Sequence, residues 1–128
     1  MDIMIDFPGG ERVDAHFGPF CVQTDQMPSN SSPSPFNVFL SSIGTCAGFY
    51  VLRFCRQREL PTEGISILER ITTNPQTKLV EMIDLEIRVP SSFPEKYHDA
   101  LVKTADLCAV KRALENPPQF KTHTVVSG

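Results

Sequence analysis

The sequence has no concentrated positive charge, no long apolar run and no compact metal-binding motif. Its formal net charge is −3 and no cluster of Lys or Arg stands out, which argues against a nucleic-acid-binding protein. The N-terminal segment MDIMIDFPGG is acidic where a secretory signal is basic, and no stretch of about eighteen apolar residues occurs. We therefore expect a soluble, cytoplasmic protein that binds neither nucleic acid nor a membrane.

The four cysteines, Cys21, Cys46, Cys55 and Cys108, are widely spread. Neither C-x-x-C nor H-x-x-x-H occurs, and a zinc site would have to be assembled from distant residues, so we expect no metal and no cofactor. A secreted disulfide framework is not expected either, because no export signal is visible. In a reducing compartment each thiol is either a buried packing residue or a chemically active group.

The chain length of 128 residues, with 41% hydrophobic residues, fits a single domain over residues 1–128. A folded monomer this small leaves much of its surface exposed, so a homodimer would gain stability. Periodicity and turn residues predict an α+β chain with three helices. The expected strands are 3–8, 13–17, 20–22, 65–73, 80–89 and 120–126, and the expected helices follow residue 34, residue 92 and residue 109.

The helix expected after Ser34 is unusually long. Ser34 is a plausible cap, Pro35 suits the first helical position, and Pro61 forces the end, which leaves about 24 residues between Ser34 and Leu60. Residues 36–52 have no polar face, so we expect sheet, another helix or a second subunit to wrap this helix. Gly44 and Gly48 would allow another backbone to approach it closely.

Two of the thiols have surroundings that favour chemistry. The small neighbours of Cys46, in the run GTCAG, leave room for a substrate or a second thiol. Cys108 precedes a predicted helix N-terminus whose N–H groups would lower a thiol pKa. Cys55 follows Cys46 by nine residues, on the opposite side of the helix and roughly 13 Å along it, so it cannot share the site. We interpret Cys55 and Cys21 as packing residues.

Two segments resemble those of a known family. The run PSPFNVFLSSIGTCAG, residues 33–48, resembles the first-cysteine helix of OsmC-like proteins, and ADLCAVKRAL, residues 105–114, resembles their second-cysteine motif. The resemblance implies an α+β, OsmC-like fold in which two chains intertwine. Sheets would wrap the long central helices, and the active sites would lie near the interface of the homodimer.

The resemblance also implies a thiol peroxidase that reduces organic hydroperoxides or hydrogen peroxide. Cys46 would be the peroxidatic thiol, Cys108 the resolving thiol, and a dithiol reductant would recycle the disulfide. In peroxide-reducing members an arginine from the N-terminal strands and a glutamate early in the central helix tune the thiolate. Arg12 is the only arginine before Cys46 and is our candidate. Phe36 and Asn37 stand where the glutamate would fall, so we expect slower turnover than in dedicated peroxidases.

Two alternatives remain open at this point. One is a small-molecule or acyl-chain binding module that keeps the OsmC scaffold while its thiols serve as packing residues. The other is a hot-dog-like acyl thioesterase, but such enzymes usually need a carboxylate on or near the long helix, and residues 36–52 contain none. Titrating the thiols with peroxide separates an enzyme from a binder.

Overall fold

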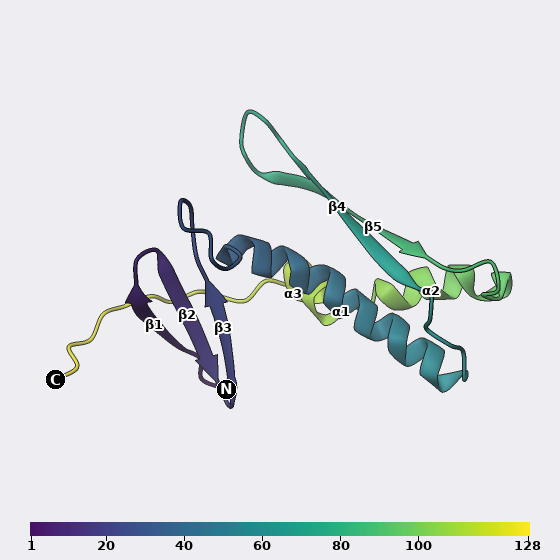
Figure 1. The fold of residues 1–128 in the computed structure, drawn as a ribbon, viewed down its shortest axis with the longest axis horizontal. Helices are drawn as coiled ribbons and strands as arrows, with labels where there is room; N and C mark the ends of the chain where they lie inside the picture. The colour runs from purple at the N-terminus through teal and green to yellow at the C-terminus, as the bar shows by residue number, and fades with distance from the viewer. The chain divides into compact units, whose positions relative to one another are not determined.

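The computed structural model describes residues 1–128. It combines helices with two small antiparallel sheets (Figure 1). Its elements are β1 (Met4–Gly9), β2 (Arg12–Phe17), β3 (Phe20–Thr24), α1 (Pro35–Gln57), β4 (Ser66–Thr73), β5 (Val80–Arg88), the 3₁₀ turn η1 (Glu95–Tyr97), α2 (His98–Ala105) and α3 (Ala109–Glu115). The chain divides into two compact units, Met1–Ser42 and Ile43–Gly128, and the division falls within α1. The α+β expectation is confirmed.

The N-terminal unit contains a three-stranded sheet in the order β1-β2-β3. The turn between β2 and β3 joins the paired residues Phe17 and Phe20, and Gly18 in this turn adopts a φ of +53°, in the left-handed region that favours glycine. The loop after β3 is organised by the buried Asp25 carboxylate, which accepts hydrogen bonds from the Gln26 N–H and from the N–H and hydroxyl of Ser31. The three predicted N-terminal strands are therefore present.

Local signals set both ends of α1. The Asn37 N–H donates to the Ser34 hydroxyl at 3.2 Å, and Pro35 occupies the first helical position, where it loses no hydrogen bond. At the other end Glu59 has a φ of +55°, and the Leu60 N–H donates to the Cys55 carbonyl at 2.8 Å, which closes the last turn. The predicted long helix is confirmed, with 23 residues.

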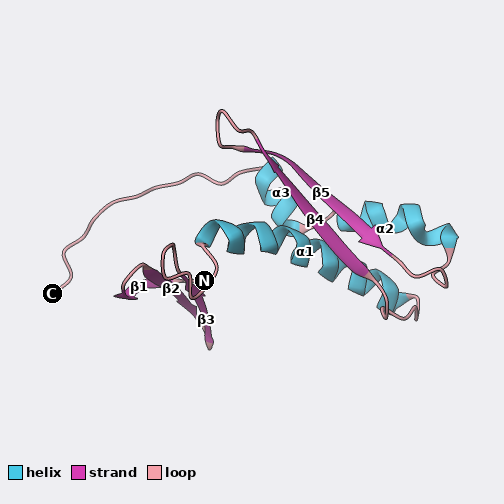
Figure 2. Ribbon diagram, turned by 45° about the horizontal axis from the view of Figure 1, so that its top comes forward, coloured by secondary structure: helices cyan, strands magenta, loops and turns pink.

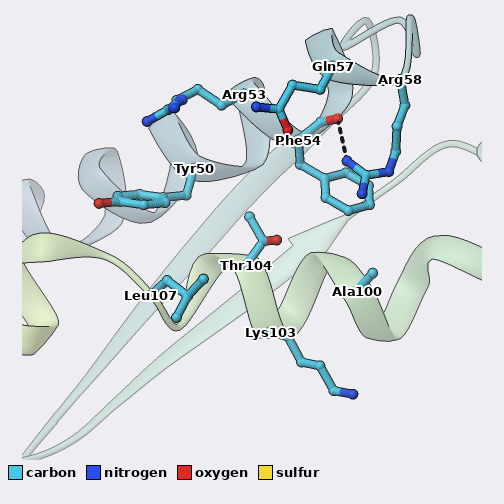
Figure 3. Close-up of a pocket in the computed structure, with 9 residues that line it drawn as sticks. All are labelled: Tyr50, Arg53, Phe54, Gln57, Arg58, Ala100, Lys103, Thr104 and Leu107. Carbon is cyan, nitrogen blue, oxygen red and sulfur yellow. Dashed lines mark hydrogen bonds between the residues drawn. The ribbon is translucent and has the colours of Figure 1, made fainter.

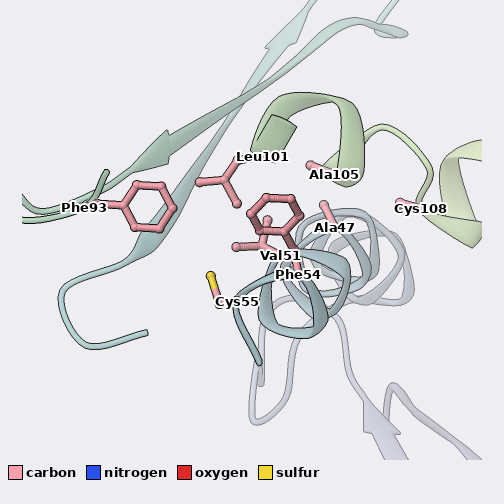
Figure 4. Close-up of a cluster of buried hydrophobic side chains, with 8 residues drawn as sticks. All are labelled: Ala47, Val51, Phe54, Cys55, Phe93, Leu101, Ala105 and Cys108. Carbon is pink, nitrogen blue, oxygen red and sulfur yellow. The ribbon is translucent and has the colours of Figure 1, made fainter. Parts of the chain in front are cut away.

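The core of the C-terminal unit lies between α1 and α2 (Figure 4). Its buried members are Ala47, Val51, Phe54, Cys55, Phe93, Leu101, Ala105 and Cys108. Partly buried apolar residues of β4 and β5 pack against this cluster, which explains why those strands alternate apolar and polar residues. Cys55 is fully buried here, so its interpretation as a packing residue is confirmed.

The β4–β5 hairpin runs beside α1 (Figure 2), and side chains of β4 reach the helix at Gly44 and Gly48. A β-carbon on Gly48 would lie 3.8 Å from Cδ1 of Ile67, which is ordinary contact. A β-carbon on Gly44 would lie 2.5 Å from Oε1 of Glu69, too close to fit without movement of that carboxylate. What approaches the helix at these glycines is the side chains of β4, and no backbone atom of another segment is among the nearest contacts of either β-carbon, so the predicted close approach of another backbone is not observed.

Two expectations from the sequence are wrong. Residues 117–128 form no strand and are exposed, because no strand of the chain pairs with the apolar residues at 120–126. Cys21 is exposed and not packed, because it lies on the edge strand β3 opposite the polar His16.

The helix α1 also has the length and apolar character of a membrane-spanning helix. A single helix of this kind is weak evidence for a membrane protein, because the core helix of a soluble protein meets the same criteria. Five residues of α1, Ile43, Ala47, Val51, Phe54 and Cys55, are buried within the chain.

Candidate functional site: the Cys46–Cys108 thiol pair

The structure brings Cys46, on α1, together with Cys108, which is the N-cap residue of α3. Cys46 accepts hydrogen bonds from the Cys108 thiol and from the backbone N–H groups of Ala109 and Val110. Sγ of Cys108 accepts a hydrogen bond from the Lys111 N–H at 3.4 Å and lies 3.9 Å from the Ile43 carbonyl oxygen, which is an alternative acceptor to Cys46 for the single proton of the Cys108 thiol. The first turn of α3 thus surrounds both sulfurs with donors.

These donors lower the pKa of Cys46. Burial alone would raise that pKa, but the hydrogen bonds from Val110, Cys108 and Ala109 together outweigh it. Ala109 and Val110 open α3, so their N–H groups have no partner within the helix and remain available to a thiolate. The geometry therefore favours the ionised, nucleophilic form of Cys46.

The pKa of Cys108 moves in the opposite direction. Burial is the main cause of its rise, the Lys111 N–H offsets only part of that effect, and the neighbouring Cys46 raises the pKa further. The expectation that the helix N-terminus would lower the pKa of Cys108 is wrong, because this sulfur is almost fully buried and the helix N–H groups also serve Cys46. The pair is consequently asymmetric, with one sulfur disposed to be a thiolate and the other to remain a thiol.

The side chains of two residues outside the pair, Lys111 and Cys55, show no sign of taking part in thiol chemistry. The ammonium of Lys111 forms an ion pair with the Asp106 carboxylate at 3.0 Å. Burial raises the pKa of Cys55, and the positive charge of Arg58 offsets this only in part, so Cys55 lacks the features of a reactive thiol.

Arg12 lies on β2, in the N-terminal unit. Its guanidinium donates to Oδ2 of Asp14 at 2.7 Å, while its Nε is buried without a hydrogen-bond partner. Phe36 and Asn37 lie exposed in the first turn of α1, where the family's glutamate was expected and is absent. The role of Arg12 in tuning a thiolate stays a prediction.

A small cavity of about 190 Å³ lies near Cys108, although neither cysteine of the pair lines it. It is lined by Ile43, Ile83, Leu85, Asp106, Lys111 and Leu114. Ile43 and Lys111 are also the two residues whose backbone groups contact Sγ of Cys108. Sequence reasoning missed this cavity because its walls come from α1, β5 and the α2–α3 region, and only the alternating apolar residues of β5 hinted at an apolar wall.

A second cavity, of about 420 Å³, opens between α1 and α2, and no cysteine lines it (Figure 3). Of the cations that line it, Arg58 contacts Phe54. Its guanidinium donates to the Phe54 carbonyl at 3.2 Å and lies 3.7 Å from the centre of the Phe54 ring. We therefore place the candidate chemistry at the thiol pair.

Comparisons with known proteins agree with this fold. No curated protein sequence matches the chain. A solved structure of an osmotic stress induced and detoxification response protein from Psychrobacter arcticus 273-4 is similar, with 17% identity over 87% of this chain and 85% of that one and a TM-score of 0.72. An OsmC-like protein from Mycoplasma pneumoniae shares 14% identity over 91% and 87% of the two chains, with a TM-score of 0.66.

The organic hydroperoxide resistance protein OhrB of Bacillus subtilis is also similar, with 12% identity over 91% of this chain and 93% of that one and a TM-score of 0.54. At these identities the solved structures show a shared fold. Residues 28–123 match the family described as OsmC-like protein, and this range includes both cysteines of the pair. The chain belongs to the OsmC family.

Proposed function

We propose that this protein is a thiol-dependent peroxidase in which Cys46 attacks the peroxide and Cys108 resolves the product. The observation that carries the proposal is the set of hydrogen bonds from Val110, Cys108 and Ala109 that lowers the pKa of Cys46. The thiolate is the nucleophilic form of cysteine, so a lowered pKa raises its fraction near neutral pH. Membership of the OsmC family, which includes peroxidases, supports the same reaction class.

The cycle balances with groups that the chain supplies and one external reductant. The Cys46 thiolate attacks the terminal peroxide oxygen, the O–O bond breaks, and the alkoxide leaves and takes a proton from solvent. Cys46 is then a sulfenic acid. Cys108 loses its proton and attacks the Cys46 sulfur, which forms a disulfide and releases the hydroxyl group as water. A dithiol returns two electrons and restores both thiols.

The cavity near Cys108 favours organic hydroperoxides over hydrogen peroxide as the substrate. Most of its lining residues, Ile43, Ile83, Leu85 and Leu114, are apolar and would receive a short alkyl group. Asn37 cannot supply the charge of the family's glutamate, so turnover is slower than in dedicated peroxidases. The protein acts as a cytoplasmic homodimer, and a dithiol reductant recycles it.

Serine variants test the assignment of roles. Cys46→Ser abolishes peroxide reduction, because a serine hydroxyl is far less nucleophilic and cannot become a sulfenic acid. Cys108→Ser supports one fast turnover and then leaves a sulfenic acid on Cys46 that a dimedone-type reagent traps. Stopped-flow peroxide consumption and mass spectrometry of the trapped peptide measure the two effects. Cys21→Ser, which changes an exposed thiol outside the pair, is the matched control and keeps full activity.

If both Cys46→Ser and Cys108→Ser keep the activity of the wild type, the peroxidase assignment is wrong. The same apolar cavity would then favour a binding module for a small alkyl or acyl compound. The hot-dog thioesterase alternative has no support from the comparisons, since the structural neighbours and the family match agree on the OsmC fold.

A further inference from the structure

A cluster of metal-ligating side chains lies outside the thiol pair, on one face of the N-terminal sheet. Asp14 and His16 are two residues apart on β2, so their side chains share a face. Cys21 on β3 is the direct cross-strand partner of His16. One ligand atom each from Asp14, His16 and Cys21 lies within 4.8 Å of the others.

The Asp14 carboxylate is buried, and one of its two oxygens has no hydrogen-bond partner. The residue is 5% exposed, and its Oδ2 binds the Arg12 guanidinium at 2.7 Å. Its other oxygen, Oδ1, is buried and has no hydrogen-bond partner. A buried carboxylate oxygen without a donor is costly, and a bound cation would remove that cost.

Asp6, on the neighbouring strand β1, is within hydrogen-bonding distance of the His16 ring. Asp6 is the cross-strand partner of Asp14, and its Oδ2 lies 3.2 Å from Nε2 of His16. When Nε2 carries the proton and donates to Asp6, Nδ1 of the ring keeps its lone pair for a metal. Histidines that bind metals usually donate their second ring nitrogen to a carboxylate in this way.

We propose that Asp14, His16 and Cys21 form a binding site for Zn²⁺. Zn²⁺ accepts thiolate, imidazole and carboxylate ligands together, and a site with three protein ligands leaves its fourth position to water or another small ligand. Donors around a tetrahedral zinc lie about 3.5 Å apart, so small side-chain rotations bring these three into range. The exposed Cys21 gives the ion a route in from solvent, and its thiol releases a proton on binding.

This site is independent of the proposed peroxidase chemistry. It departs from the expectation of no metal, which rested on the absence of C-x-x-C and H-x-x-x-H spacing and on the view that a site would have to be assembled from distant residues. The tight turn between β2 and β3 is what brings Cys21 opposite His16, and a search for C-x-x-C or H-x-x-x-H spacing does not detect such a pairing.

Cobalt titration of the reduced, full-length protein tests the site. Co²⁺ bound to a thiolate gives a charge-transfer band in the near ultraviolet, and Zn²⁺ should displace it at one ion per chain. The double variant Cys46→Ser/Cys108→Ser keeps the band, because the proposed ligands are intact. Cys21→Ser loses it and binds Zn²⁺ at least about tenfold more weakly, and His16→Gln weakens binding similarly. Circular dichroism checks that each variant is folded.

The absence of a band in the wild type would overturn the proposal, as would its persistence in Cys21→Ser or its loss in Cys46→Ser/Cys108→Ser. Asp6→Asn tests the support of His16 and weakens Zn²⁺ binding about tenfold, while Glu11→Gln, at an exposed carboxylate in the β1–β2 turn, is the matched control and has no effect. Equal affinities for these two variants would contradict the role given to Asp6. Peroxide reduction by Cys21→Ser is measured separately, so failure of the zinc site and failure of the peroxidase are distinguishable.

Discussion

At Cys46 and Cys108, one helix N-terminus acts on two sulfurs with opposite results. Cys46 is partly exposed and receives the N–H groups of Ala109 and Val110, so hydrogen bonding outweighs burial. Cys108 is almost fully buried, so burial prevails. Sequence reasoning found both cysteines and the helix start beside Cys108, but it assigned the lowered pKa to the wrong sulfur. Which sulfur the N–H groups serve depends on how α3 packs against α1, and no local pattern encodes that packing.

The pH dependence of alkylation tests this asymmetry. A thiol reacts as its thiolate, so the alkylation rate of each cysteine rises with pH through its pKa. We predict a midpoint for Cys46 below that of an unperturbed cysteine, about 8.5, and a midpoint for Cys108 above it. Iodoacetamide labelling followed by peptide mass spectrometry measures both. Cys108→Ala removes one donor and should raise the midpoint of Cys46, and a midpoint at or above the unperturbed value in the wild type would contradict the account.

At the scale of elements, the sequence was most informative where structure is local. The cap at Ser34, the long apolar helix and the hairpin of β4 and β5 follow from signals within a few residues. The strand expected at 120–126 failed because a strand also needs a partner, and pairing partners are not visible in a local pattern. The cavity beside Cys108 was missed for the same reason, since distant segments build it.

The two glycines of α1 give a prediction about the contact between α1 and β4. Gly48→Ala should stabilise the protein by up to about 1 kcal/mol, because alanine favours the helix and its β-carbon meets only ordinary contact with Ile67. Gly44→Ala should be less stable than Gly48→Ala, because its β-carbon displaces the Glu69 carboxylate. Urea unfolding measures both changes.

Removing the Glu69 carboxylate provides the control for the Gly44→Ala and Gly48→Ala comparison. In a Glu69→Ala background the obstruction is gone, so Gly44→Ala should there stabilise by about as much as Gly48→Ala does. Equal effects of the two glycine substitutions in the wild-type background would show that β4 does not approach α1 as described.

At the scale of the whole molecule, much of the apolar helix α1 is left exposed by a single chain. Only 28% of the most apolar stretch of α1 is buried within the chain, and side chains such as Phe49 remain 53% exposed. Proteins of the OsmC family are typically homodimers. The absence of a polar face in residues 36–52 already predicted a cover of this kind, although it could not distinguish a second subunit from a sheet.

We therefore predict a stable dimer. Light scattering coupled to size exclusion should give about twice the chain mass of 14.3 kDa, and the value should persist on dilution. Phe49→Glu, which adds a charge to an exposed apolar position of α1, should weaken the assembly. A folded monomer at all concentrations of the wild type would be inconsistent with the prediction.

The central claim is that Cys46 and Cys108 form one redox pair, and a single measurement addresses it most directly. The reduced protein is treated with one equivalent of an organic hydroperoxide, quenched by alkylation and digested, and its peptides are mapped by mass spectrometry. The account predicts an intramolecular disulfide that joins the Cys46 and Cys108 peptides, while Cys21 and Cys55 are recovered as alkylated thiols. Recovery of Cys46 and Cys108 as free thiols, or their oxidation with no preference over Cys21 and Cys55, would contradict it.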